Sequence, residues 1–187
     1  MPFKDMNQPI GRPRLRIVEG GAVGSAAEPD DFDALFRRYS PYVASIGVRL
    51  LGRDDEIDDL VQDVFLEAHR GLASVREPGA IKGWLARICV RRAVRRLRRR
   101  KLRSFLSLDT LAADPSLIAP GASPEARAEV TRLYERLARL PALERVVWVL
   151  RHLEGEGLDE IAVLCECSKS TVQRRLRSAD AALEVAP

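Results

Sequence analysis

The sequence has few of the residues on which disulfide-bonded proteins and many enzymes depend. Its 187 residues include three cysteines, two histidines and only 5% aromatic residues. The cysteines, Cys89, Cys165 and Cys167, are too few for the disulfide framework of a small secreted domain, so we expect a reduced protein in the cytoplasm. Cys165 and Cys167 also lack the second pair of ligands that a structural zinc site needs, so we expect no metal and no cofactor.

Long apolar runs and catalytic motifs are missing as well. No stretch approaches the roughly 18 apolar residues of a membrane span, and residues 1–28 lack the apolar run of about 7 to 15 residues of a secretory signal. We therefore expect neither membrane insertion nor export. There is no glycine-rich phosphate loop or nucleophile elbow, and neither His69 nor His152 lies in a recognisable triad. We expect no enzymatic activity.

The residues that are abundant favour helices. Hydrophobic residues make up 46% of the chain, and the alanine, leucine and arginine that it contains in quantity are strong helix formers. The predicted fold class is therefore all-α. Since domains have about 50 to 200 residues, the chain can hold one medium domain or two small ones, and its breaks in regular structure favour two.

Apolar spacing and proline or glycine breaks divide the chain into four segments. The prediction is a disordered N-terminal tail at 1–29, a helical domain at 30–103, a flexible linker at 104–123 and a second helical domain at 124–187. The first domain has three helices, the first of which is capped by Asp30 or Asp31, bent or restarted at Pro41 and ended by Gly52. The second has four short helices, beginning after the cap residue Ser123.

Two segments of the first domain carry opposite charge. Residues 54–67 hold seven carboxylates and no lysine or arginine, whereas residues 91–103 hold eight arginines and one lysine. Blocks of like charge persist either as solvated surface or because a complementary surface neutralises them. The pattern therefore suggests a cationic partner for the first segment and a polyanionic partner for the second. The apolar stripe of the acidic helix leaves five polar residues mostly off the core side: Asp55, Asp58, Asp59, Gln62 and Asp63.

The last two predicted helices have the form of a helix-turn-helix motif. The first covers Leu158 to about Cys165, a turn follows at 166–168, and the second helix begins with polar and basic residues. Such a motif binds DNA by placing the start of its second helix in the major groove. An ordinary helical hairpin with a solvated cationic face is the alternative.

The acidic segment also allows a metal-site interpretation. Asp59, Asp63 and Glu67 lie at i, i+4 and i+8, as carboxylates do in metal-binding helical bundles. Those sites also need a Glu-x-x-His pairing, and His69 is two residues from Glu67, which turns it away. A helical metal-dependent hydrolase is therefore the weaker alternative.

Several short motifs, taken together and in order, resemble those of the bacterial extracytoplasmic-function (ECF) sigma factors of the sigma-70 superfamily. They are FDALFRRY at 32–39, DDLVQDVF at 58–65, GWLARI at 83–88, LARLP at 137–141, EIA at 160–162 and SxxTV at 168–172. The resemblance implies a transcription initiation factor that binds core RNA polymerase and directs it to promoters, recognising and melting promoter DNA. It covers about residues 30–184.

The resemblance also implies roles for particular residues. The acidic helix would dock on the β′ clamp of core RNA polymerase, and the contact residues of the helix are Asp55, Asp58, Asp59, Gln62 and Asp63. The protein would also contact the β subunit of core polymerase. The arginine-rich helix would bind and melt the minus-ten element through Trp84, Arg87, Arg91, Arg92, Arg95, Arg96, Arg98 and Arg99. The second helix of the helix-turn-helix would read the minus-thirty-five element through Ser168, Lys169, Ser170, Thr171, Gln173, Arg174, Arg175 and Arg177. An anti-sigma factor is a further implied partner.

Four positions depart from the family pattern, one of them Cys167, which stands where an apolar residue is common. Arg91 and Arg95 stand where similar proteins usually carry an Asn and an Asp, and Glu166 stands in the turn where a Gly is common. We expect base capture near Arg91 to differ, and we expect strain at Glu166 if that turn needs a positive φ. The alternative function is a conventional helix-turn-helix regulator that binds duplex DNA without polymerase, which would leave the acidic helix unexplained.

Overall fold

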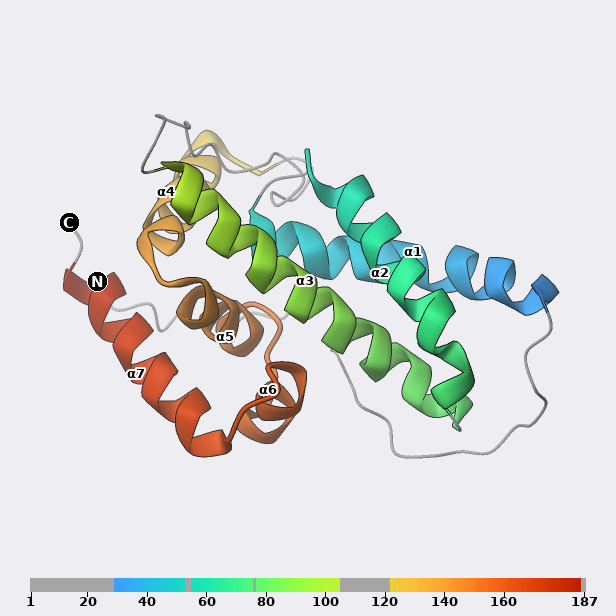
Figure 1. Ribbon diagram of the computed structural model, residues 1–187. Helices are drawn as coiled ribbons and strands as arrows, with labels where there is room; N and C mark the ends of the chain where they lie inside the picture. The colour runs from blue at the N-terminus through green and yellow to red at the C-terminus, as the bar shows by residue number, and fades with distance from the viewer. Residues whose placement is uncertain (1–28, 53–54, 76, 105–121, 186–187) are drawn as a thin grey trace.

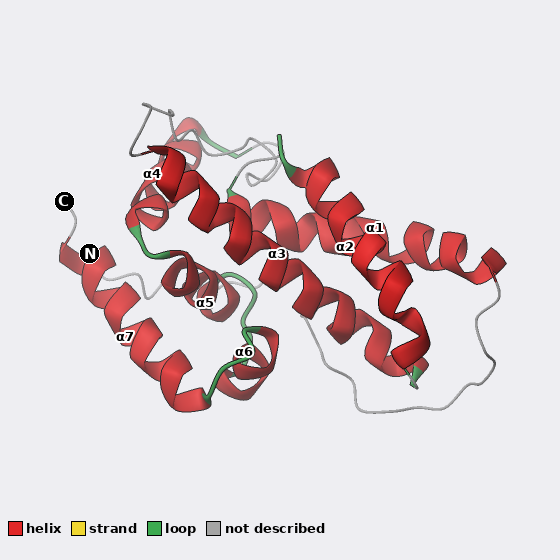
Figure 2. Ribbon diagram, viewed as in Figure 1, coloured by secondary structure: helices red, strands yellow, loops and turns green. Residues whose placement is uncertain are grey.

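The computed structural model describes residues 29–52, 55–75, 77–104 and 122–185. Within these ranges the chain forms helices and no strands, which confirms the predicted all-α class (Figures 1 and 2). The predicted tail, apart from Pro29, and most of the predicted linker lie outside the described residues. Among the residues described, no helix is both long enough and apolar enough to cross a lipid bilayer.

Three long helices form what we term the N-terminal unit: α1 (Pro29–Leu51), α2 (Ile57–Gly71) and α3 (Ile81–Ser104). Two short 3₁₀ turns, η2 (Leu72–Ser74) and η3 (Pro78–Ala80), lie between α2 and α3. Each of the three helices packs against the other two (Figure 1). The apolar stripes predicted from the sequence face inward, since Leu50, Leu60 and Leu85 are all fully buried.

The helix α1 differs from the prediction at its start and in its middle. It begins before Asp30 and Asp31, the predicted caps, and it continues through Pro41 without restarting there. A proline removes one backbone hydrogen bond and usually bends or ends a helix. Here the turn that follows is held by Val43 and Ile46, both fully buried, so packing outweighs the local preference.

The arginine block is the second half of α3. Ala93, Val94 and Leu97 lie between the arginines and are at most 7% exposed. These three side chains continue the apolar stripe of the first half of the helix. The block is therefore anchored to the core and forms a helical surface, as the sequence predicts.

Four shorter helices form the C-terminal unit: α4 (Pro124–Arg139), α5 (Ala142–His152), α6 (Leu158–Leu164) and α7 (Lys169–Val185). Two predicted helix caps are confirmed. The Oγ of Ser123 accepts a hydrogen bond from the Ala126 N–H at 3.2 Å, and the Oγ of Ser168 accepts one from the Thr171 N–H at 3.3 Å. The last helix packs against both α5 and α6.

The two units pack directly against each other. Both α1 and α3 contact α5, and α3 also contacts α6 (Figure 1). The buried apolar side chains of the two units form one continuous cluster. The two predicted helical domains are therefore in apolar contact with each other in the structure.

The most specific contacts between the units lie at the C-terminal end of α1. The last carbonyl groups of a helix have no partner within it, so other groups must satisfy them. Three side chains donate hydrogen bonds to these carbonyls: Tyr134 Oη to Arg49 O at 3.1 Å, Arg145 Nε to Leu50 O at 3.0 Å and Arg100 Nη1 to Leu51 O at 3.1 Å. Tyr134 and Arg145 belong to the C-terminal unit, which therefore completes the end of a helix in the other unit.

Arg145 is a charged side chain inside the shared core. It is only 5% exposed, and burial lowers its pKa to about 10, which leaves it charged at neutral pH. Its guanidinium lies 5.8 Å from the centroid of the Tyr134 ring. A buried charge is tolerated only where hydrogen bonds and partners compensate for lost water, so these contacts fix how α5 sits on α1.

Replacing Gly52 by alanine tests this junction. Gly52 has a φ of +71°, and an added Cβ would lie 2.6 Å from Tyr134 Cδ1 and 2.8 Å from Arg145 Nη2. The left-handed backbone alone costs a non-glycine residue about 1–2 kcal/mol, and the close contacts add to that. We expect Gly52→Ala to lower the thermal unfolding temperature clearly. Gly79→Ala is the control, because no atom lies within 4 Å of its added Cβ; equal unfolding temperatures for the two variants would contradict the junction.

Candidate interaction surfaces

The acidic residues of the α2 segment divide between two faces of the helix. Asp58, Asp59 and Gln62 are exposed. Glu56, which precedes the helix, faces α3. Asp63 and Glu67, about two and three turns further along the inner face, do so as well. Asp55 is exposed at the start of the segment. The five residues predicted as one surface are therefore not equivalent, since Asp63 is engaged within the protein.

Arginines of α3 pair with the inward carboxylates in an antiparallel series, which we term the α2–α3 ion-pair ladder. Its rungs are Arg92–Glu67 at 2.6 Å, Arg96–Asp63 at 2.6 Å and Arg100–Glu56 at 2.8 Å, with Arg91 also on Glu67. Successive rungs are one helical turn apart on α3, because Arg92, Arg96 and Arg100 are spaced i, i+4, i+8. The charge complementarity seen in the sequence is thus partly satisfied inside the chain.

The carboxyl group of Glu67 is the most strongly held in the ladder. Partial burial on its own would raise its pKa, but hydrogen bonds from Arg92 and Arg91 outweigh that effect and hold the pKa below the ordinary value of 4.5. The group is therefore ionised across the physiological range. Asp63 and Glu67, two of the three carboxylates in the metal-site interpretation, bind arginines in the structure. Within the described ranges no group of three or more metal-ligating side chains occurs.

The outer side of α3 presents a second, exposed stripe of cations. Arg95, Arg98 and Arg99 are exposed, and Arg87, about two turns before Arg95, is half-buried. Trp84 packs on the end of α2, where a Cβ added to Gly71 would lie 2.9 Å from its Cζ2 atom. The predicted minus-ten residues therefore form three sets, a packed tryptophan, arginines within the ladder and exposed arginines, with the half-buried Arg87 outside all three.

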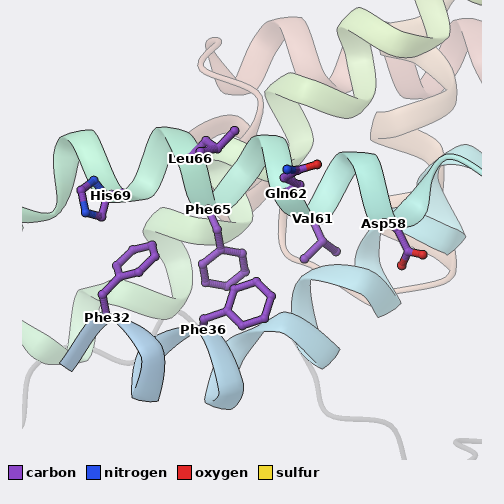
Figure 3. A pocket seen from close by; sticks show the side chains of 8 residues that line it. All are labelled: Phe32, Phe36, Asp58, Val61, Gln62, Phe65, Leu66 and His69. Atoms are coloured by element: carbon purple, nitrogen blue, oxygen red, sulfur yellow. The ribbon is translucent and has the colours of Figure 1, made fainter. Parts of the chain in front are cut away.

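An open apolar groove lies beside the exposed face of α2 (Figure 3). Phe32 and Phe36 of α1 point toward Phe65 of α2, and the Phe36 and Phe65 ring centroids are 4.7 Å apart. The groove has a volume of about 530 Å³. Its lining also includes the exposed side chains of Asp58, Gln62 and Leu66, of which Leu66 is 51% exposed. Acidic and apolar groups thus adjoin on one surface, as suits a partner that is both cationic and apolar.

The helix-turn-helix motif is formed by α6, a turn and α7. The turn is a Schellman motif: the Cys167 N–H donates to Ala162 O at 3.0 Å and the Glu166 N–H donates to Val163 O at 3.3 Å. Glu166 has the left-handed φ of 52°, where glycine is preferred. The positive φ considered from the sequence is therefore confirmed, and a glutamate adopts it.

The predicted DNA-reading residues of α7 differ in how freely they face solvent. Ser168 is the helix cap, Lys169 pairs with Asp159 at 2.9 Å, and Arg175 donates to Cys167 Sγ at 3.9 Å. Thr171 lies 2.9 Å from Ser168 through its Oγ1. Four further residues have exposed side chains along the start of the helix: Ser170, Gln173, Arg174 and Arg177. The motif therefore presents a polar, basic surface at the N-terminal part of α7.

Comparison with known proteins identifies the family. Residues 35–103 match the model of sigma-70 region 2, and residues 131–183 match that of sigma-70 region 4. The ECF RNA polymerase sigma factor SigM of Mycobacterium tuberculosis H37Rv is 34% identical over 175 residues, spanning 92% of this chain and 85% of SigM. The chain belongs to the ECF sigma factors. It is a transcription initiation factor that directs RNA polymerase to promoters, and the alternative of a regulator acting without polymerase is not favoured.

Two further relatives of this sigma factor agree in sequence and in fold. The ECF RNA polymerase sigma-E factor of Escherichia coli K12 is 32% identical over 163 residues, which are 82% of this chain and 84% of that protein. The solved structure of the sigma factor RpoE from Bartonella quintana, in complex with the anti-sigma factor NepR, is 22% identical with a TM-score of 0.61. The likeness covers 84% of this chain and 99% of that one. The similarity to the RpoE structure concerns the fold alone.

Sequence reasoning missed several residues of this sigma factor that the structure brings together. Leu66 could have been found, because it is a large apolar residue off the core stripe of α2. Arg49 and Glu154 pair across the two units, with Nη2 to Oε2 at 3.1 Å, although 105 residues separate them. Arg145 gives no sequence signal, since a single arginine in an amphipathic helix is ordinarily exposed.

Glu67→Gln tests the ladder. The variant removes the anion of Arg92 and one of the two carboxylates that Arg91 binds. Charge-assisted hydrogen bonds of this kind contribute about 1–3 kcal/mol. We expect the free energy of unfolding in urea to fall by that amount at pH 7, relative to the exposed control Glu129→Gln. Because the folded pKa of Glu67 is lowered, its stabilisation is present above the ordinary pKa and is lost as the pH falls through the folded value. A wild-type advantage that stays constant down to pH 3 would contradict the ladder.

Proposed function

We propose that this sigma factor divides its charged residues between internal ion pairs and two outward surfaces, one for core RNA polymerase and one for promoter DNA. The observation that carries the proposal is the exposure of Asp58, Asp59 and Gln62 beside an apolar groove, while Asp63 and Glu67 bind arginines. Exposed carboxylates raise the negative potential of that face and favour a cationic partner.

The proposed polymerase surface consists of the exposed face of α2 and the adjoining groove. It would contact the β′ clamp of core polymerase through Asp55, Asp58, Asp59 and Gln62. Asp63 contributes less directly, because Arg96 holds its carboxylate at 2.6 Å. Phe36 and Leu66 supply apolar area at the same place, and such area usually contributes more to affinity than exposed charges do. Contacts with the β subunit are also proposed.

The proposed minus-ten surface is the outer stripe of α3. Arg95, Arg98 and Arg99 are exposed and can neutralise phosphates, which gives affinity that falls steeply with salt. Arg92 and Arg96 are held by carboxylates and would contact DNA only by leaving the ladder. Trp84 packs on the end of α2 and would hold α3 in place. We assign the same supporting role to Arg92 and Arg96 of the ladder. Melting then depends on single-strand capture along this face.

The proposed minus-thirty-five surface is the start of α7. Gln173 and Arg174 are exposed and lie one after the other in the first turns, where recognition helices contact base edges. Ser168, as the cap, orients the helix so that its first N–H groups face phosphate. We also propose that an anti-sigma factor controls the protein. We propose further that this sigma factor acts in the cytoplasm, where the bacterial polymerase and chromosome lie.

Charge reversal on the exposed face of α2 tests the polymerase surface. We expect the double variant Asp58→Lys, Asp59→Lys to lose co-elution with core RNA polymerase in size exclusion at physiological salt, because both side chains are exposed and reversal repels a cationic partner. The double variant Glu129→Lys, Glu184→Lys is the control: it carries the same change in net charge at exposed sites elsewhere. If the first pair binds polymerase as the control does, the surface is wrongly assigned.

Arg174→Ala tests the reading of the upstream element. On a promoter selected from random-sequence DNA by the holoenzyme, we expect binding to weaken by about 1–3 kcal/mol if Arg174 contacts a guanine edge. Binding is measured on that promoter and on one with the upstream element scrambled, with the exposed Arg132→Ala as control. A base contact predicts a loss on the selected promoter alone. An equal loss on both templates would mean that Arg174 binds phosphate only.

A further inference from the structure

The groove between α1 and α2 is apolar with an acidic end, and the N-terminal tail of the same chain contains a segment that is apolar and cationic. We propose that this segment, residues 12–18, binds the groove in the free protein and leaves it when core RNA polymerase binds there. The displacement by polymerase rests on the proposed function, since it uses the assignment of the groove to polymerase. Residues 12–18 are termed here the docking segment.

The groove leaves large apolar side chains uncovered on both of its helices. Phe36 of α1 is 40% exposed and Leu66 of α2 is 51% exposed, and both line the same hollow (Figure 3). Single exposed apolar residues are ordinary, but apolar residues that adjoin in a concave surface favour a ligand. The volume of about 530 Å³ lies within the range of roughly 300–1,000 Å³ that is usual for binding sites.

The two ends of the groove differ in charge. Asp58 lines one end and Asp59 follows it in the chain, and both side chains are exposed. His69 lies at the opposite end (Figure 3), where its ring packs edge-on against Phe32 with centroids 4.9 Å apart. An occupant that fits the groove therefore has apolar groups along α2 and positive charge toward Asp58.

The docking segment has the composition that such a groove needs. Its sequence is RPRLRIV, in which arginines at 12, 14 and 16 alternate with a proline, a leucine and an isoleucine. There is no carboxylate between Met6 and Val18. Residues that alternate in an extended chain point to opposite sides. An extended docking segment would thus turn apolar side chains toward the groove and leave its arginines free to reach the carboxylates at the rim.

The chain between the docking segment and α1 has a suitable length. It is EGGAVGSAAE at 19–28, mostly glycine, alanine and serine. A flexible chain of this length has a root-mean-square end-to-end distance of roughly 16–19 Å. The helix α1 begins at Pro29, three residues before Phe32 and so at the His69 end of the groove. From His69 to Asp58 the helix α2 rises about 16 Å, so the docking segment can reach the acidic end.

Tethering makes a weak contact sufficient. A short flexible linker holds two sites at an effective concentration in the millimolar range. A segment that as a separate peptide bound the groove with a Kd of about 0.1 mM would then occupy it about nine-tenths of the time. A tighter partner displaces such a segment but binds roughly tenfold more weakly than to an empty groove. The tail therefore lowers the affinity for polymerase without abolishing it.

Photo-cross-linking of the full-length protein, without polymerase, tests where the docking segment binds. Ile17 is replaced by p-benzoylphenylalanine, the protein is irradiated, and the linked peptides are identified by mass spectrometry. We expect cross-links within one molecule to the groove, at residues 32–36 and 58–69. Cross-links spread over the whole surface, or concentrated on the C-terminal unit, would overturn the proposal. Cross-links that join two molecules would overturn it as well, because they would assign the groove to the tail of a second copy.

Variants of the tail show whether the cross-link depends on the arginines. Neutralising all three should lower its yield roughly fivefold, because several weak ion pairs with the exposed carboxylates are lost together. The variant is Arg12→Gln, Arg14→Gln, Arg16→Gln. The control, Val23→Gln with Ala26→Gln, lies between the docking segment and α1 and should leave the yield unchanged. An equal yield from the arginine variant and the control would contradict the charge complementarity.

The affinity for core RNA polymerase tests the displacement. Leu15→Gln with Ile17→Gln keeps every charge of the tail and removes its apolar contacts with the groove, so we expect this variant to bind polymerase up to about tenfold more tightly than the wild type. Val23→Gln with Ala26→Gln should bind as the wild type does. Equal affinities for all three forms would overturn the displacement.

The two experiments separate the failure of this proposal from that of the proposed function. Cross-linking is measured without polymerase, so its result does not depend on whether the chain binds polymerase. If no form of the protein binds polymerase, the proposed function is rejected, and with it the displacement. If polymerase binds normally but the cross-links miss the groove, only the docking of the tail is rejected.

Discussion

The ion-pair ladder between α2 and α3 is the interaction on which the charged surfaces of this sigma factor depend. A helix with eight arginines in thirteen residues places like charges one turn apart, which destabilises it. The ladder binds one stripe of those arginines to carboxylates of α2 and so leaves the opposite stripe to face solvent. The same pairing turns Asp63 and Glu67 inward and Asp58 and Asp59 outward. One set of contacts therefore stabilises the three-helix unit and sorts its charges by direction.

The second constraint is the C-terminal end of α1. Its carbonyl groups receive hydrogen bonds from Tyr134, Arg145 and Arg100, two of which belong to the other unit. Gly52 makes this approach possible, since its left-handed φ turns the chain away and its missing Cβ leaves room for the Tyr134 ring and the Arg145 guanidinium. Two ion pairs also join the units, Arg49–Glu154 and Arg91–Glu166. Together with them, this junction ties the position of the helix-turn-helix motif to the helix that bears the arginines.

Much of the fold was predictable, because apolar periodicity determines which face of each helix is buried. The helices and the caps at Ser123 and Ser168 follow from short stretches of chain, whereas the positive φ at Glu166 was suggested by the glycine that similar proteins carry there. The continuous helix at Pro41 does not, since burial of Val43 and Ile46 outweighs the tendency of proline to end a helix. The outward face of Asp58 and Asp59 was predictable from the same period. The pairing of Asp63 with Arg96 and of Arg91 with Glu166 was not, because each joins residues distant in sequence through a particular helix packing.

The most direct measurement is in vitro transcription by core RNA polymerase on fragmented genomic DNA of the source organism. The reaction is run with and without the purified protein, and the start site of every transcript is determined by sequencing. Promoter direction by this sigma factor predicts a set of start sites that require the chain and share two sequence elements at a fixed spacing, one near minus ten and one near minus thirty-five. Start sites that are the same with and without the chain, or that share no upstream sequence, would contradict it.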